Sequence, residues 1–310
     1  MHRRAGLAAV LVALVAGVAG CGLGAGGDVG GVTLIVTRDF GSAALPGSPV
    51  SVDAPGGETV MRALERHFKV TTRYGGGFVQ SIDGEAGGTQ GGRPVDWFYY
   101  VNGVEAPRGS ASTGLHRGDV VWWDRHDWGA TQHIPAVVGA FPEPFLHGSG
   151  GTRFPARLEC SASAGAACQT AQQTLGEAGV IAGEAAFGSR GGEDLLRVVV
   201  GPWNEVRSDF AVRLLARGPA ASGVYARPSA DGRSLAVLDP QGRAVRTLGA
   251  GTGLIAATVT QGQPPVWIVT GTDDAGVTRA ARSLTAAVLR DRFAVAVTGS
   301  GPVALPQVRP

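Results

Sequence analysis

The sequence predicts an α+β protein in which a small mixed sheet holds one helix and is followed by a unit of alternating strands and helices. β-branched and aromatic runs dominate the part before residue 129, with one amphipathic helix pattern among them. Beyond residue 151, strand and helix patterns alternate along the chain, which is typical of an α/β unit with a largely parallel sheet. The length of 310 residues fits one large domain or two ordinary ones.

The charge balance excludes one class of partner. The 27 basic and 25 acidic residues are dispersed, without the clustered cations that displace counterions from nucleic acid. We therefore expect no nucleic-acid partner. Lys69 is the only lysine and follows Phe68, so a phosphate-binding P-loop is also excluded.

The first 20 residues predict a secretion signal, because two arginines precede an apolar run from Leu7 to Val18 that is too short to span a bilayer. The residues before Cys21 resemble a bacterial lipobox, which predicts acylation of Cys21 and a lipid anchor on the outer face of the cytoplasmic membrane. The glycine-rich residues 21–31 then serve as a tether. An ordinary signal peptide with an incidental cysteine is the alternative.

The first folded unit is expected over residues 32–128. Strands are predicted at 32–38 and 50–52, and Thr59 is a candidate N-cap for a helix with an apolar stripe through Phe68. Further strands follow at 78–82, at 97–101 and at 120–124, and the pair Asn102-Gly103 predicts a type I′ hairpin.

Five segments of this unit resemble a known family: VTLIVTRD, ETVMRAL, FVQSIDG, WFYYVNGV and LHRGDVVWW. Together they are similar to the bacterial domain related to the C-terminal β domain of transcobalamin and intrinsic factor. The resemblance covers about a third of the chain, and it implies a ubiquitin-like β-grasp fold with a cobalamin-related binding role. In the vertebrate carriers a helical barrel forms the other wall of the site, and no such helical repeats stand in this sequence.

Aromatic residues supply the candidate ligand site. Strand alternation places Trp97, Tyr99 and Val101 on one face and Phe98 and Tyr100 on the other. One set is expected to face the helix, and the other either stacks on a flat ligand or is covered by loops and the second unit. The candidate ligand-binding residues are Trp97, Phe98, Tyr99, Tyr100, Trp122, Trp123, His126 and Trp128.

Histidines and acidic residues near these aromatics are also considered as ligands of a metal ion. His126 and His133 with Asp124 or Asp127 are potential ligands, yet their spacing matches no standard site, so we predict no metal. No cofactor is predicted beyond cobalamin or another corrinoid as a ligand.

A connection is expected at residues 129–151 and an α/β unit of unknown role at 152–300. Cys160 and Cys168 are predicted to form a disulfide, which suits an oxidising compartment. Two strand-to-helix corners carry Asn204 and the pair Asp273 and Asp274, at the sheet edge where α/β proteins bind ligands. Capping of a helix by the aspartates is the structural alternative.

Three functions stay open. The first is a lipid-anchored binding protein for cobalamin or another corrinoid, which hands its ligand to a membrane transporter. The second is an interaction module for another envelope protein, without a small ligand. The third is an enzyme centred on Asp273, Asp274 and Asn204 that acts on an envelope glycan, although the common hydrolase motifs are missing.

Overall fold

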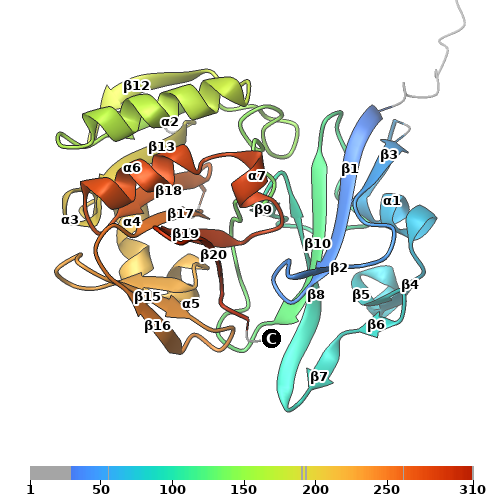
Figure 1. Cartoon of the computed structure of the whole chain (residues 1–310). Helices are drawn as coiled ribbons and strands as arrows, with labels where there is room; N and C mark the ends of the chain where they lie inside the picture. The colour runs from blue at the N-terminus through green and yellow to red at the C-terminus, as the bar shows by residue number, and fades with distance from the viewer. Residues whose placement is uncertain (1–28, 55, 190, 193, 261, 309–310) are drawn as a thin grey trace, which may run out of the picture.

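The computed structural model describes residues 29–308 except 55, 190, 193 and 261, so the predicted signal peptide and Cys21 lie outside the described residues. Two sheet-based halves lie side by side (Figure 1). Among the described residues no helix has the length and apolar character needed to cross a membrane. Helices and mixed sheets occur together, as the predicted α+β class requires.

The first half is built on a mixed sheet of order β2-β1-β10-β8-β7, with β3 paired to β1 and β9 paired to β8. β1 and β10 are parallel neighbours, and the other pairs are antiparallel. The strands of this sheet are β1 (Val29–Arg38), β2 (Ala43–Ala44), β3 (Val50–Ala54), β7 (Gly88–Gln90), β8 (Arg93–Val101), β9 (Val104–Glu105) and β10 (Val120–Asp127).

Helix α1 (Val60–His67) packs against this sheet and begins as predicted. The Thr59 hydroxyl accepts a hydrogen bond from the Arg62 amide at 3.3 Å, and the helix buries Val60, Met61 and Leu64. Beside it lies a small antiparallel sheet of β4 (Val70–Arg73), β5 (Phe78–Ile82) and β6 (Glu85–Ala86), with the 3₁₀ turn η1 (Tyr74–Gly76) between β4 and β5.

The predicted turn residues do more than turn the chain. Asn102 and Gly103 have φ of 54° and 75°, as a type I′ hairpin requires. The Asn102 side chain is also buried, and its amide donates to Asp119 Oδ1 and to the Gly148 carbonyl, each at 2.8 Å. Asn102 therefore ties the hairpin to the segment that leads into the second half.

The second half has a sheet of order β12-β11-β13-β18-β17-β19-β20. The pairs among the first four strands are parallel and the remaining three pairs are antiparallel, so the prediction of a largely parallel sheet is wrong for half of it. The strands are β11 (Ala156–Cys160), β12 (Ala182–Ala186), β13 (Leu196–Pro202), β17 (Gly253–Thr258), β18 (Val266–Gly271), β19 (Ala294–Thr298) and β20 (Gly301–Leu305).

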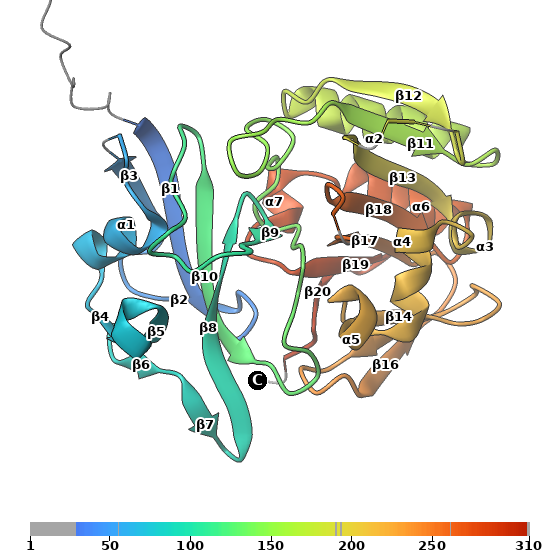
Figure 2. The same cartoon turned by 180° about the vertical axis from the view of Figure 1, so that it is seen from behind.

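Helices α2 (Gly165–Glu177) and α6 (Asp274–Arg282) cover one face of this sheet (Figure 2). The apolar stripe of Val277, Ala281, Leu284 and Val288 predicts one helix over 272–289, but α6 ends at Arg282 and the chain becomes helical again only in α7 (Ala286–Leu289). The other face packs on short helices and on a three-stranded sheet. These elements are α3 (Trp203–Val206), α4 (Phe210–Arg213), η2 (Leu214–Arg217), α5 (Pro219–Ser222), β14 (Ala226–Pro228), β15 (Leu235–Leu238) and β16 (Ala244–Leu248).

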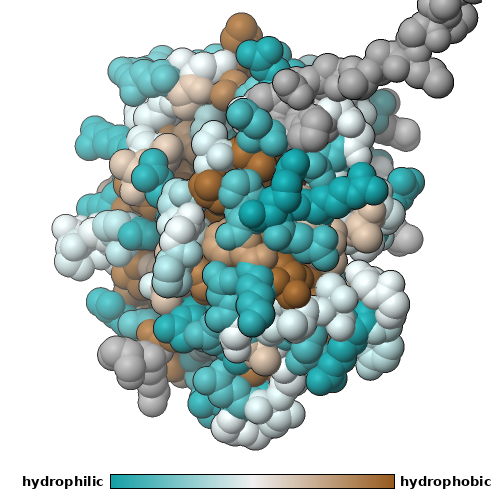
Figure 3. Space-filling model, turned by 90° about the vertical axis from the view of Figure 1, so that its right-hand side faces the viewer, coloured by the Kyte–Doolittle hydropathy of each residue, from teal (hydrophilic) through white to brown (hydrophobic). Residues whose placement is uncertain are grey.

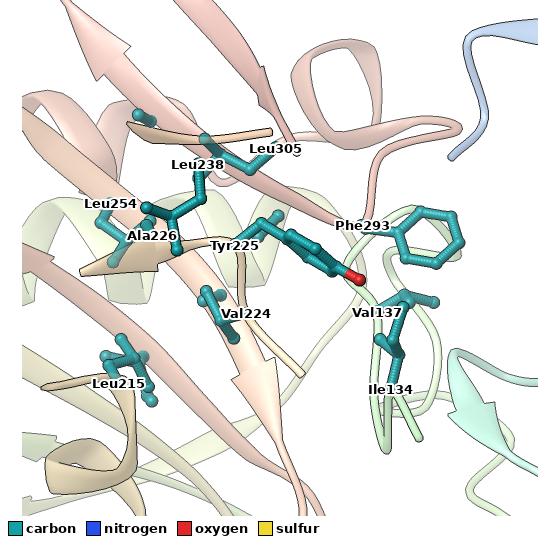
Figure 4. Packing of buried hydrophobic residues seen from close by; sticks show 14 of the residues in the cluster. Ile134, Val137, Leu215, Val224, Tyr225, Ala226, Leu238, Leu254, Phe293 and Leu305 are labelled. Carbon is teal, nitrogen blue, oxygen red and sulfur yellow. The ribbon is translucent and has the colours of Figure 1, made fainter. Parts of the chain in front are cut away.

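One hydrophobic cluster joins the two halves. It contains Tyr100 and Trp122 from the first sheet, Tyr225 and Phe293 from the second half, and Val137 from the connecting segment. Figure 4 shows the rings of Tyr225 and Phe293 beside Ile134 and Val137. Residues 129–151, predicted as a connection, have no helix or strand but bury several apolar side chains between the halves.

A buried carboxylate anchors this interface. Asp124 has no exposed surface, and its oxygens accept hydrogen bonds from the Thr37 hydroxyl at 2.6 Å and from the amides of Phe40 and Gly41 at 3.1 and 2.8 Å. The Nδ1 atom of His126 lies 2.9 Å from the same carboxylate. These bonds hold the loop after β1, whose residues Asp39, Phe40 and Gly41 all have positive φ.

Gly41 cannot carry a side chain in this loop. A Cβ there would lie 2.0 Å from the Asp291 carbonyl oxygen, and φ is +79°. We expect Gly41→Ala to lower the free energy of unfolding by about 2 kcal/mol or more in urea denaturation, because both backbone strain and a steric clash oppose it. Gly47 has a similar φ of +83° with no atom within 4 Å of such a Cβ. Gly47→Ala is the matched control, and an equal loss in both variants would contradict the account of the interface.

Asp39 makes stability depend on pH. Burial, and then the charge of Asp124, raise the pKa of the Asp39 carboxyl. A raised folded-state pKa means that the ionised group destabilises the fold at neutral pH, and that this penalty disappears as the pH falls below the folded pKa. We expect Asp39→Asn to raise the Tm at pH 7, with the gain shrinking in acid. Asp231→Asn is the comparison variant, because the Ser229 hydroxyl lowers the pKa of the Asp231 carboxyl. A lowered folded-state pKa means that the ionised group stabilises the fold at neutral pH, so this variant should lower the Tm at pH 7.

Candidate functional site

The central strands β8 and β10 divide the predicted aromatic residues between two faces of the first sheet. In their antiparallel register, Tyr99 is opposite Trp123 and Tyr100 is opposite Trp122. Trp97, Tyr99 and Trp123 belong to the cluster that faces α1, and Tyr100 and Trp122 belong to the cluster shared with the second half. The predicted alternation along the strand is confirmed.

The face toward the second half is fully packed. Tyr100, Trp122 and His126 are at most 2% exposed, and the ring of Phe293 contacts each of them at centroid distances of 5.6, 5.0 and 5.3 Å. Phe98 stacks on His126 at 4.5 Å. Tyr100, Trp122 and His126 are buried against the second half, so a ligand reaches their rings only if the halves separate, whereas Phe98 is partly buried.

The opposite face has an open cavity of about 200 Å³. Its floor is formed by Trp97, Tyr99 and Trp123, and the rings of Tyr99 and Trp123 stack at 4.8 Å. One wall comes from the start of β5, at Gly77–Val79, and the other from the segment after β9, including Gly109 and Ser110. Phe98 also lines the cavity, although its ring stacks on the other face of the sheet.

The polar side-chain atoms of the three floor residues differ in whether they have a hydrogen-bond partner. The Trp97 indole donates to the Glu85 carbonyl at 2.9 Å, and the Tyr99 hydroxyl bonds to Arg108 and Thr113. Trp123 is only 2% exposed, and its Nε1 atom has no hydrogen-bond partner among the described residues. A buried N–H without an acceptor costs about 1–3 kcal/mol, so the Trp123 indole is a donor without an acceptor in the described part of the chain, on a residue that lines the cavity.

An exposed aromatic residue stands at the rim of the cavity. Tyr74 is 85% exposed, with φ of 52°, and its ring meets Phe78 edge to face at 6.4 Å. Gly75 and Gly76 follow, also with positive φ, so the turn presents Tyr74 to solvent. Figure 3 views the molecule from this half, and apolar surface is visible there among polar side chains. Sequence reasoning missed Tyr74, although its place before a glycine run was a signal of a turn.

Trp128 lies apart from this cavity. It is partly buried beyond the end of β10, and its indole donates to Asp96 Oδ2 at 2.8 Å. Of the eight predicted aromatic and histidine candidates, the structure gathers Trp97, Phe98, Tyr99 and Trp123 around one cavity.

The histidines do not converge on a metal. His126 pairs with Asp124, whereas His133 lies 3.2 Å from Glu105. Among the described residues, the one group with metal-ligand geometry is Cys160, Cys168 and Glu184. The two cysteines form a disulfide with a Cα–Cα distance of 6.0 Å, which ties the end of β11 to the first turn of α2 and removes both thiols as ligands.

The acidic corner of the second half has a structural role. Asp273 caps α6 by accepting from the Gly276 amide at 2.8 Å, and its other oxygen accepts from the Gly251 amide at 2.7 Å. Asp274 is exposed and lies 3.4 Å from the Ser163 hydroxyl. Asn204 lines a separate groove with Trp203 and Arg213. Helix capping therefore accounts for Asp273 without catalysis.

Comparison with known proteins gives one match. Residues 57–127 match the model of a family described as a domain of unknown function (DUF4430), and no curated protein matches. The matched segment runs from the residues before α1 to the end of β10, so it includes the floor, both walls and the rim of the cavity.

Proposed function

We propose that this chain is a lipid-anchored, extracytoplasmic binding protein whose first half holds part of a planar ligand on the Trp123 cavity. The observation that carries the proposal is the stacked pair of Tyr99 and Trp123 lining an open cavity, with a buried indole N–H on Trp123 that has no acceptor among the described residues. Aromatic faces bind flat rings, and a buried donor selects a ligand with an acceptor at its edge.

The resemblance to the C-terminal domain of transcobalamin and intrinsic factor makes a corrinoid the first ligand to test. A β-grasp domain is supported by the single helix on a mixed sheet in which the outermost long strands in sequence, β1 and β10, are parallel neighbours. The volume of about 200 Å³ is below the 300–1,000 Å³ that enclose a drug-sized ligand, so this cavity takes one edge of a corrinoid. Tyr74 and Phe78 at the rim extend the contact, and a partner or transporter supplies the remaining wall.

An interaction module without a small ligand is the second candidate. Tyr74, exposed on a turn with positive φ, also suits contact with an envelope protein. A ligand titration separates the two functions.

The lipid anchor is tested by Cys21→Ala in the full chain. We expect the variant to leave the membrane fraction and to lack acyl mass, because the acyl group on Cys21 is the proposed membrane attachment. Unchanged membrane association without acyl mass on Cys21 would contradict the anchor.

The ligand site is tested by calorimetric titration of residues 21–310, carrying Cys21→Ser, with cyanocobalamin. We expect saturable binding with a Kd at or below the micromolar range, and Trp123→Phe should weaken it about tenfold by removing one hydrogen-bond donor. Trp128→Phe is the matched control outside the cavity and should leave the affinity unchanged. Absence of binding heat would favour the interaction module, and equal losses in both variants would place the ligand elsewhere.

A further inference from the structure

A second cavity lies where the two halves meet. Its volume is about 470 Å³, and it is formed by the loop after β1, the segment between α7 and β19, and the chain from β20 to residue 308. Its polar lining residues are Ser42, Arg290, Asp291, Arg292 and Gln307. It lies on the opposite side of the first sheet from the Trp123 cavity, because its wall includes Phe40, which packs on His126.

Arg292 has an unusual environment. It is partly buried, its Nη1 atom is shielded from solvent, and its guanidinium has no hydrogen bond or ion pair among the described residues. A cation that is removed from water without a partner is costly, and arginine is normally paired with a carboxylate or phosphate when it is buried. Within the described residues, the Arg292 guanidinium therefore has donors that a bound acceptor can use.

Asp291 lines the same cavity and carries the opposite charge. Its carboxylate is partly buried and makes no hydrogen bond or ion pair within the described part of the chain. Burial is the main reason that its pKa is raised, Arg290 opposes the rise, and the charge of Asp124 adds to it. Asp124 itself is already bonded to Thr37 and to two backbone amides, so it does not compete for a bound cation.

The two charges do not satisfy each other, because no ion pair joins Asp291 and Arg292 in the described part of the chain. Neighbouring residues of opposite charge that both lack partners among the described residues fit a ligand which carries both charges. A simple anion would leave Asp291 unpaired and would add repulsion to it.

We propose that this cavity binds a zwitterionic small molecule of the amino-acid or short-peptide class, with its carboxylate on Arg292 and its ammonium on Asp291. The cavity volume lies within the range of small-molecule sites. Ser42 and Gln307 line the same cavity and supply further hydrogen-bonding groups for the backbone of such a ligand. This site is separate from the Trp123 cavity, and it stands whether or not a corrinoid binds there.

The test is calorimetric titration of residues 21–310, carrying Cys21→Ser, with three matched probes. Alanyl-alanine carries both charges, N-acetyl-alanyl-alanine carries only the carboxylate, and alanyl-alanine amide carries only the ammonium. We expect alanyl-alanine to bind at least tenfold more tightly than either blocked probe, because each blocked probe leaves one partly buried charge without a partner. Equal affinity for the zwitterion and a blocked probe would overturn the assignment, as would absence of binding by alanyl-alanine.

Variants locate the site on the protein. Arg292→Gln should weaken alanyl-alanine binding about tenfold or more, and Asp291→Asn should bring its affinity close to that of the N-acetylated probe. Arg217→Gln, at an exposed arginine outside the cavity, is the matched control and should change nothing. Thermal unfolding establishes that each variant is folded. Full affinity in folded Arg292→Gln would refute the proposal even if the peptide binds.

Discussion

The buried carboxylate of Asp124 is the constraint on which the arrangement of the two halves depends. It has no exposed surface, and it accepts hydrogen bonds from Thr37, Phe40 and Gly41 while it pairs with His126. A buried charge is tolerated only when such partners are in place, so β10 and the loop after β1 must adopt this geometry together. The loop in turn places Phe40 against Tyr225 and Phe293 of the second half, at 5.2 Å from each ring.

This constraint assigns different roles to the two faces of one sheet. The face that carries Trp122 is closed by aromatic packing against the second half, whereas the face that carries Trp123 remains accessible between the β5 turn and the segment after β9. The indole N–H groups of these two neighbouring tryptophans therefore differ in hydrogen bonding. Trp122 donates to the Thr37 hydroxyl at 2.7 Å, whereas the Trp123 N–H has no acceptor among the described residues. The proposed binding function rests on this asymmetry.

Local patterns predicted much of the fold, and long-range packing decided the rest. The Thr59 cap, the strand at 78–82 and the alternation through Trp97–Val101 are confirmed because each depends on neighbours in the chain. The antiparallel strands β17, β19 and β20 were missed, since small and β-branched residues at their positions give no distinct pattern before pairing. Which aromatic face stays open could not be predicted, because Phe293 closes one face from more than 160 residues away. The partnerless Nε1 of Trp123 likewise has no signature in the sequence.

The most direct test of this asymmetry is ¹⁹F NMR of the soluble chain labelled with 5-fluorotryptophan and titrated with cyanocobalamin. The six tryptophans give separate probes on both faces of the first sheet and in the second half. The account predicts that the Trp97 and Trp123 resonances shift or broaden saturably, while those of Trp122, Trp203 and Trp267 stay in place. A saturable change at Trp122 without one at Trp123, or no change at any of the six, would contradict it.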